Sequence, residues 1–112
     1  MSSRLIRIHK DRRQLELYEG NVLLRRFPIA VGKASTPTPV GRFSIAEKRL
    51  DPGGVFGSRW LGLSKPGYGI HGTSDPSSIG KAISKGCIRM YNYHVEELFR
   101  NVEVGTPVII EP

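Results

Sequence analysis

Residues 69–73 have the sequence GIHGT, and residues 84–90 have the sequence SKGCIRM. The second stretch contains the only cysteine, Cys87, and the first contains His71 between small residues and an apolar neighbour. A thiol and an imidazole are the minimum parts of a cysteine nucleophile and its base. Several glycines between them suit the backbone to close approach. We therefore interpret the rest of the chain as a scaffold that brings Cys87 to His71.

The composition is that of a soluble globular protein. The chain has 112 residues, of which 38% are hydrophobic and 24% charged, and we expect a single domain over residues 1–112. Thirteen glycines and eight prolines favour tight turns and short strands over long helices. No apolar run approaches transmembrane length, and the first residues lack the apolar core of a signal peptide. We expect no membrane span, no visible leader and a monomer, either cytoplasmic or exported by a route that the sequence does not show.

The chain is strongly basic, with 17 Lys and Arg against 10 Asp and Glu and a net charge of +7. Such a surface favours polyanions, although a solvated basic face is the plainer interpretation. The basic residues are scattered, apart from a light cluster at Arg4, Arg7, Lys10, Arg12 and Arg13. No nucleic-acid-binding module is recognisable, so we expect no nucleic-acid partner. A lone cysteine and no zinc-ligand spacing lead us to expect no disulfide, metal or cofactor.

Alternation of polar and apolar residues predicts a chain of short strands. They cover residues 4–8, 14–18, 22–27, 42–46, 58–63, 68–71 and 108–110. The first three form an antiparallel meander, and residues 29–31 extend the third strand past Pro28, which indicates an edge position or a bulge. Residues 32–41 form a stiff loop because two prolines restrict its backbone.

One helix is predicted, near residues 92–102, with Asn92 as its cap. Its apolar stripe consists of Val95, Leu98, Phe99 and Val102. Residues 75–83 are predicted as a loop with one short helical turn capped by Asp75. Together these elements predict a mainly β fold, a small sandwich or barrel with one short α-helix.

Of the three histidines, His71 is the best candidate base. It ends a predicted strand and precedes Gly72, whose carbonyl could accept from one ring nitrogen and direct the other towards Cys87. His9 lies among basic residues, and His94 suits the surface of the helix. A structural histidine and a small buried cysteine remain the plain alternatives.

The residues around Cys87 suit acyl transfer. Gly86 permits a sharp turn, and the N–H groups of Lys85, Gly86 and Cys87 could form an oxyanion hole. The charge of Lys85 is expected to lower the pKa of the thiol. Arg89 is expected on the same face as Cys87, where it could hold a substrate carboxylate, although both cations are also ordinary surface charges.

These motifs resemble those of L,D-transpeptidase catalytic domains, the YkuD-like family. The resemblance lies in IHGT at residues 70–73 and SKGCIRM at residues 84–90. It extends to TPTPVGRF at residues 36–43, preceded by Gly32-Lys33, and to GTPV at residues 105–108, so it spans nearly the whole chain. One departure is Lys85, because the family most often has histidine between the serine and the glycine.

The resemblance implies a mostly β sandwich of the family type and an extracytoplasmic, cell-wall location. Cys87 would attack a peptidoglycan stem tetrapeptide after its third residue and expel the terminal D-alanine. An amine of a neighbouring stem would resolve the thioester into a 3→3 cross-link. His71 would be the base, and carbapenems would acylate Cys87. We expect Arg89, Ser84 and Tyr68 to contact the substrate.

Two other functions remain open at this point. An L,D-carboxypeptidase or another wall cysteine peptidase would give the same thioester to water. A non-catalytic module that binds wall peptide or an anionic polymer would not need the thiol, and Lys85 would then mark lost chemistry.

Overall fold

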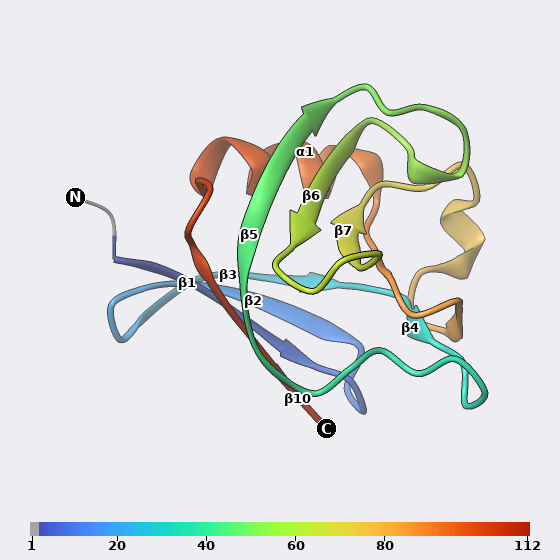
Figure 1. Cartoon of the computed structure of the whole chain (residues 1–112), viewed down its shortest axis with the longest axis horizontal. Helices are drawn as coiled ribbons and strands as arrows, with labels where there is room; N and C mark the ends of the chain where they lie inside the picture. The colour runs from blue at the N-terminus through green and yellow to red at the C-terminus, as the bar shows by residue number, and fades with distance from the viewer. Residues whose placement is uncertain (1–2) are drawn as a thin grey trace.

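The computed structural model describes residues 3–112. The strands are β1 (Arg4–His9), β2 (Gln14–Glu19), β3 (Val22–Pro28), β4 (Val31–Gly32), β5 (Gly41–Leu50), β6 (Arg59–Leu63), β7 (Gly69–His71), β8 (Ala82–Ser84), β9 (Ile88–Arg89) and β10 (Pro107–Glu111). Helix α1 spans Asn92–Asn101, and the short 3₁₀ turns η1 and η2 span Gly54–Phe56 and Pro76–Ser78. The fold is therefore mainly β with one α-helix in the described part of the chain, which confirms the predicted class (Figure 1).

Eight of the strands form one curled sheet in the order β3-β2-β1-β10-β5-β6-β7-β9. Strand β5 joins the two halves, because residues 41–44 pair with β10 and residues 45–50 pair with β6. The register of β5 shifts between Ile45 and Glu47, where a bulge lets a strand bend. Figure 1 shows β5 as the long curved strand that leads from β10 to β6.

The two ends of this sheet meet beyond β3. Ala30 forms an antiparallel bridge with Arg89, which belongs to the opposite edge strand β9. Strand β4 then pairs in parallel with β8. The curled sheet is thereby closed at one end like a barrel, next to the SKGCIRM turn.

The core lies inside this curl and under α1. The inward positions of β1, β2 and β10 are Ile6, Ile8, Leu15, Leu17, Val108 and Ile110, all essentially without solvent exposure. The predicted stripe of α1 supplies buried Val95, Leu98 and Val102, and Phe99 packs against the same core. Because α1 packs against β6 and β7, the apolar stripe of the helix fixes the strand that carries His71.

The strand predictions are confirmed apart from their ends, but three details were wrong. Residues 29–31 do not extend β3, which ends at Pro28 on the edge of the sheet. Asn92 is not the cap, because α1 begins after Tyr91 and has no side-chain cap. The short strands β8 and β9 were not foreseen. No helix among residues 3–112 is long and apolar enough to cross a bilayer.

Candidate active site

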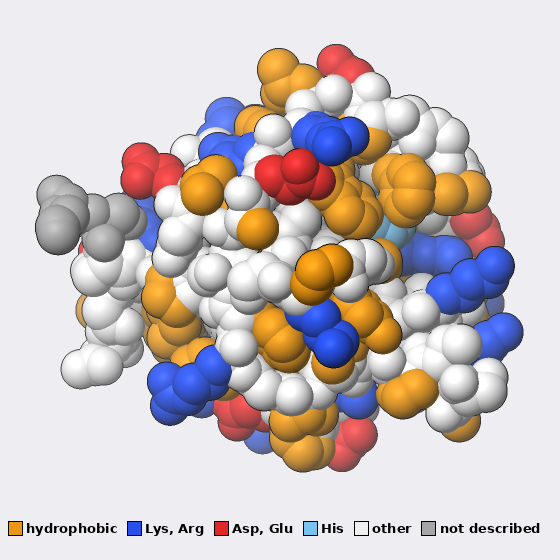
Figure 2. Space-filling model, in the orientation of Figure 1, with side chains coloured by type: hydrophobic (Ala, Val, Ile, Leu, Met, Phe, Trp, Pro, Cys, Tyr) orange, Lys and Arg blue, Asp and Glu red, His pale blue; other side chains and the backbone are white. Residues whose placement is uncertain are grey.

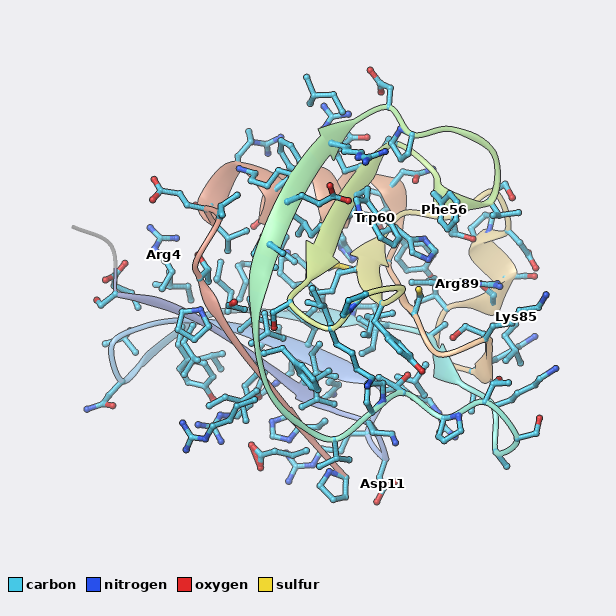
Figure 3. All side chains as sticks on the ribbon, in the orientation of Figure 1. Arg4, Asp11, Phe56, Trp60, Lys85 and Arg89 are labelled. Atoms are coloured by element: carbon cyan, nitrogen blue, oxygen red, sulfur yellow. The ribbon has the colours of Figure 1, made fainter. Side chains whose placement is uncertain are left out.

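The two motifs meet at a cavity of about 610 Å³. Its lining consists of Val55, Phe56, Trp60, Gly67, His71, Ser84, Lys85, Cys87 and Arg89. Figure 3 shows Phe56 and Trp60 on one side of this region and Arg89 and Lys85 on the other. In Figure 2 hydrophobic side chains gather there around a recess with a histidine at its floor and Lys and Arg side chains beside it. The structure therefore brings His71 and Cys87 to one hollow, as the sequence predicted.

His71 is held by its neighbours on all sides and is only 3% exposed. Its ring stacks on Trp60, with centroids 5.7 Å apart at 17°, and meets the edge of Phe56 at 5.1 Å. The ring Nδ1 lies 2.5 Å from the carbonyl oxygen of Gly72. Since a carbonyl only accepts, Nδ1 carries the proton and donates it, which leaves Nε2 of the neutral ring as a proton acceptor.

Burial lowers the pKa of His71 to about 4. The hydrogen bond to Gly72 opposes this shift, and the positive charge of Arg89 adds to it. The imidazole is therefore neutral at pH 7 and able to accept a proton.

Asn92 fixes the backbone that orients His71. Its Oδ1 accepts from the N–H groups of Ser58 and Thr73, each at 3.1 Å, and its Nδ2 donates to the Thr73 carbonyl at 3.0 Å. A side chain at Gly72 would place its Cβ 2.0 Å from the Asn92 Oδ1. From the sequence Asn92 was expected to cap the helix, and no local pattern pointed to this role.

The turn that carries Cys87 depends on glycine at position 86. Gly86 has φ +120°, and an added Cβ would lie 2.7 Å from the ring of Tyr68. Ser84 Oγ accepts from the Gly86 N–H at 3.1 Å and donates to the Cys87 carbonyl at 2.6 Å. Ser84 thus uses its hydroxyl inside the turn, and its contact with a substrate stays a prediction, as does that of Tyr68, which contacts Gly86.

The proline-rich loop supports the same turn from outside. Thr38 is fully buried; its Oγ1 accepts from the Gly32 N–H and donates to the Gly86 carbonyl, both at 2.9 Å. Thr36 Oγ1 donates to the Ser84 carbonyl at 3.0 Å. From the sequence this segment was expected to be a stiff loop and part of the family resemblance, but neither threonine was given a role.

The protonation state of Cys87 differs from the prediction. Burial raises the pKa of the thiol, while a hydrogen bond with the Gly69 backbone and the charge of Arg89 partly oppose the rise. The positive charge that lowers this pKa is that of Arg89, whereas the predicted cation, Lys85, is exposed to solvent. The resting pair is therefore a neutral thiol and a neutral imidazole, rather than a thiolate and an imidazolium.

The predicted oxyanion hole also needs one correction. The Gly86 N–H is occupied by Ser84 Oγ, so Gly86 cannot contribute its own donor. The N–H groups of Lys85 and Cys87 have no acceptor among residues 3–112. Two free donors therefore flank the thiol, and they remain the candidates for this role.

Two cations line the cavity and form no ion pair with a carboxylate in the described part of the chain, although the charge of Arg89 contributes to a lowered pKa of the Asp75 carboxyl. Arg89 is half-buried, and its backbone forms two hydrogen bonds with Ala30. The Arg89 carbonyl accepts from the Ala30 N–H at 2.9 Å, and the Arg89 N–H donates to the Ala30 carbonyl at 3.0 Å. Lys85 is exposed at the rim. Arg89 is thus the better ordered of the two, next to His71 in the β7–β9 register.

The chain belongs to the YkuD family of L,D-transpeptidase catalytic domains, whose sequence profile matches residues 3–110. The YkuD protein of Bacillus licheniformis is 54% identical over 107 residues, which is 96% of this chain and 65% of that protein. An L,D-transpeptidase from Mycobacterium smegmatis has the same fold, with a TM-score of 0.89 and 22% identity over 99% of this chain and 59% of its own. The structure of the Ldtfm–avibactam carbamoyl enzyme is 28% identical, with a TM-score of 0.86 over 100% of this chain and 50% of its own.

This chain therefore spans less than two thirds of the length of each of these three proteins. The family and the fold are shared over nearly all of its own residues.

Proposed function

We propose that this chain is an L,D-transpeptidase that uses Cys87 as nucleophile and His71 as base, acting on peptidoglycan stem peptides. The observation that carries the proposal is the buried, neutral His71, with Nδ1 bonded to Gly72 and Nε2 unprotonated, on the wall of the cavity that contains Cys87. Family membership supports the reaction class. A cell-wall location follows from the substrate proposed.

The first half of the reaction forms a thioester. His71 Nε2 takes the thiol proton as Sγ attacks the carbonyl of the third residue of a stem tetrapeptide. The oxyanion would lie between the free N–H groups of Lys85 and Cys87. When the carbon–nitrogen bond breaks, the proton on Nε2 passes to the leaving amine of D-alanine.

The second half transfers the acyl group to the side-chain amine of a diamino acid on a neighbouring stem. His71 takes a proton from this amine as it attacks the thioester, and returns it to the departing thiolate. A 3→3 cross-link forms and the neutral thiol is restored. Water in place of the amine would give the carboxypeptidase reaction instead.

Arg89 is proposed to bind a substrate carboxylate. Its guanidinium lines the cavity and forms no ion pair with a carboxylate among residues 3–112. A planar guanidinium binds a carboxylate through two parallel hydrogen bonds, so it can fix orientation as well as position. Lys85 would add charge at the rim without that geometry.

Covalent labelling tests the nucleophile. Intact-mass spectrometry after incubation with avibactam, and separately with a carbapenem, should show one adduct that peptide mapping places on Cys87. The adduct should be absent in Cys87→Ala, and His71→Gln should slow its formation about 100-fold or more. An unmodified wild-type mass after long incubation would contradict the proposal.

Product analysis separates the transpeptidase from the carboxypeptidase. With a tetrapeptide donor and a diamino acid acceptor, the cross-linked product should dominate over the hydrolysed tripeptide. Hydrolysis that is unaffected by added acceptor would assign the chain to the carboxypeptidase reaction.

A further inference from the structure

A second cavity, of about 460 Å³, lies on the outer face of β1, β2 and β3. It differs from the catalytic cavity in its chemistry, because its lining includes Arg7, His9, Arg12, Glu16 and Arg26. Figure 3 shows Asp11, in the β1–β2 turn next to this cavity, far in that view from Arg89 and Lys85. None of these groups has a part in the reaction proposed for Cys87.

The floor of this cavity is an organised network. Glu16 is 3% exposed although it faces outward from β2, and its carboxylate accepts from Tyr18, His9 and Arg26. Arg26 donates to one Glu16 oxygen through both Nε and Nη2, each at 3.0 Å. This contact leaves Nη1 without a partner among residues 3–112, while the buried carboxylate fixes the plane of the guanidinium. Arg26 is 51% exposed, so its free donors are accessible to a ligand.

The cationic surface continues into a neighbouring cavity of about 350 Å³. The two cavities share Arg12 and Arg26, and the second also includes Arg13. Neither Arg12 nor Arg13 has a carboxylate partner in the described part of the chain, and the buried Nε of Arg13 has no hydrogen-bond partner there. Arg13 also adopts φ +50°, a conformation that few residues other than glycine occupy.

We propose that these two cavities, called here the arginine groove, bind a linear polymer with repeated phosphate groups. A single anion would occupy one guanidinium, whereas Arg12, Arg13 and Arg26 line two adjoining hollows, and the fourth arginine, Arg7, is paired with Glu111. Repeated charge along a chain matches this arrangement, and guanidinium groups match phosphate oxygens. The aromatic residues of the groove are Tyr18, whose hydroxyl binds Glu16, and fully buried Phe27, so neither offers a free face for stacking bases. A polyol-phosphate chain therefore fits better than a nucleic acid.

Titration calorimetry with inorganic tripolyphosphate and with a glycerol-phosphate oligomer tests the groove. Both should bind wild-type protein, with an affinity that falls as salt rises. The double variant Arg12→Gln/Arg26→Gln should bind at least tenfold more weakly. The matched control Arg49→Gln/Arg100→Gln removes the same charge from exposed positions outside the groove and should change affinity less than twofold.

Equal weakening in the two double variants, or no binding by wild type at low salt, would overturn the proposal. If poly-glutamate bound as tightly as the phosphate oligomer, the groove would not select phosphate over carboxylate. If oligothymidylate bound more tightly than the phosphate oligomer, the groove would favour a nucleic acid. Either result would contradict the proposal. Labelling of Cys87 by avibactam should be the same in both double variants. The groove and the catalytic proposal can therefore fail independently.

Discussion

Replacing Thr38 by valine tests how the catalytic turn is supported. The Thr38 hydroxyl accepts from the Gly32 N–H and donates to the Gly86 carbonyl, and all of Thr38 is buried. Valine has nearly the same shape but neither donates nor accepts. Thr38→Val therefore leaves one buried donor and one buried acceptor without partners, while the packing is kept.

The structure gives the expected size of this effect. Each orphaned buried group costs about 1 to 3 kcal/mol, and the added methyl group returns about 0.8 kcal/mol. The free energy of unfolding should fall by about 3 kcal/mol, which lowers the midpoint temperature by roughly 12 °C for a domain of this size. Because Gly86 adjoins Cys87, acylation by avibactam should also slow, on the order of tenfold, at temperatures where the variant is folded.

Urea unfolding and the acylation rate provide the assay, and Thr36→Val is the matched control. Thr36 also donates to a backbone carbonyl of the turn, but that carbonyl, of Ser84, keeps its bond from the Lys33 N–H at 3.0 Å. Thr36→Val should therefore cost less than about 1 kcal/mol, and Thr38→Ser should stay close to wild type. If Thr38→Val cost no more than Thr36→Val, the assignment of Thr38 as a support of the turn would be refuted.

The remaining predictions concern His71 and Asn92. Because burial holds the pKa of His71 at about 4 against 6.5 for the free ring, the unfolded chain binds its proton first as pH falls, and stability should drop by about 3 kcal/mol between pH 6.5 and 4. Urea unfolding across this range should show the slope, and His71→Gln should remove most of it; an unchanged slope would argue against a buried neutral ring. The acylation rate should decline with an apparent pKa near 4, and a midpoint near 6.5 would contradict the same assignment. Asn92→Ala should lower stability by about 2 kcal/mol and slow acylation, whereas Asn101→Ala on the same helix should lower stability alone; equal acylation rates would show that Asn92 does not position the site.

The fold was predictable where a local pattern repeats. Polar and apolar residues largely alternate in β1 and β2, and the stripe of α1 recurs at helical spacing, so most of their buried positions could be named from the sequence. β9 has only two residues, and β8 has three, which is too short for a period to appear. Their partners lie far away in the chain, and closure of the sheet at Ala30 and Arg89 is a long-range contact that no local pattern encodes.

The site was predictable to the extent that its chemistry is carried by residue type. A single thiol and a histidine before glycine singled out Cys87 and His71 as candidates, and the expected contact of His71 with the Gly72 carbonyl is present. Asn92 and Thr38 were missed because their importance depends on which distant N–H and carbonyl groups they reach. Glu16 was not singled out from the sequence, yet neighbouring side chains cover it and it organises the arginine groove.

The protonation states of Cys87 and His71 show why residue identity alone was insufficient. From the sequence, the positive charge of Lys85, two residues from Cys87, was expected to lower the pKa of the thiol. In the folded chain Lys85 is exposed, so solvent weakens its field, whereas both reacting groups lose most of their hydration. Trp60 and Phe56, which pack on the His71 ring, are part of this burial. Desolvation therefore outweighs the nearby charges and moves the pKa of the thiol up and that of the imidazole down. In the proposed reaction, the proton transfer that creates the thiolate consequently belongs to the step in which Cys87 attacks the substrate, and both groups are neutral before it.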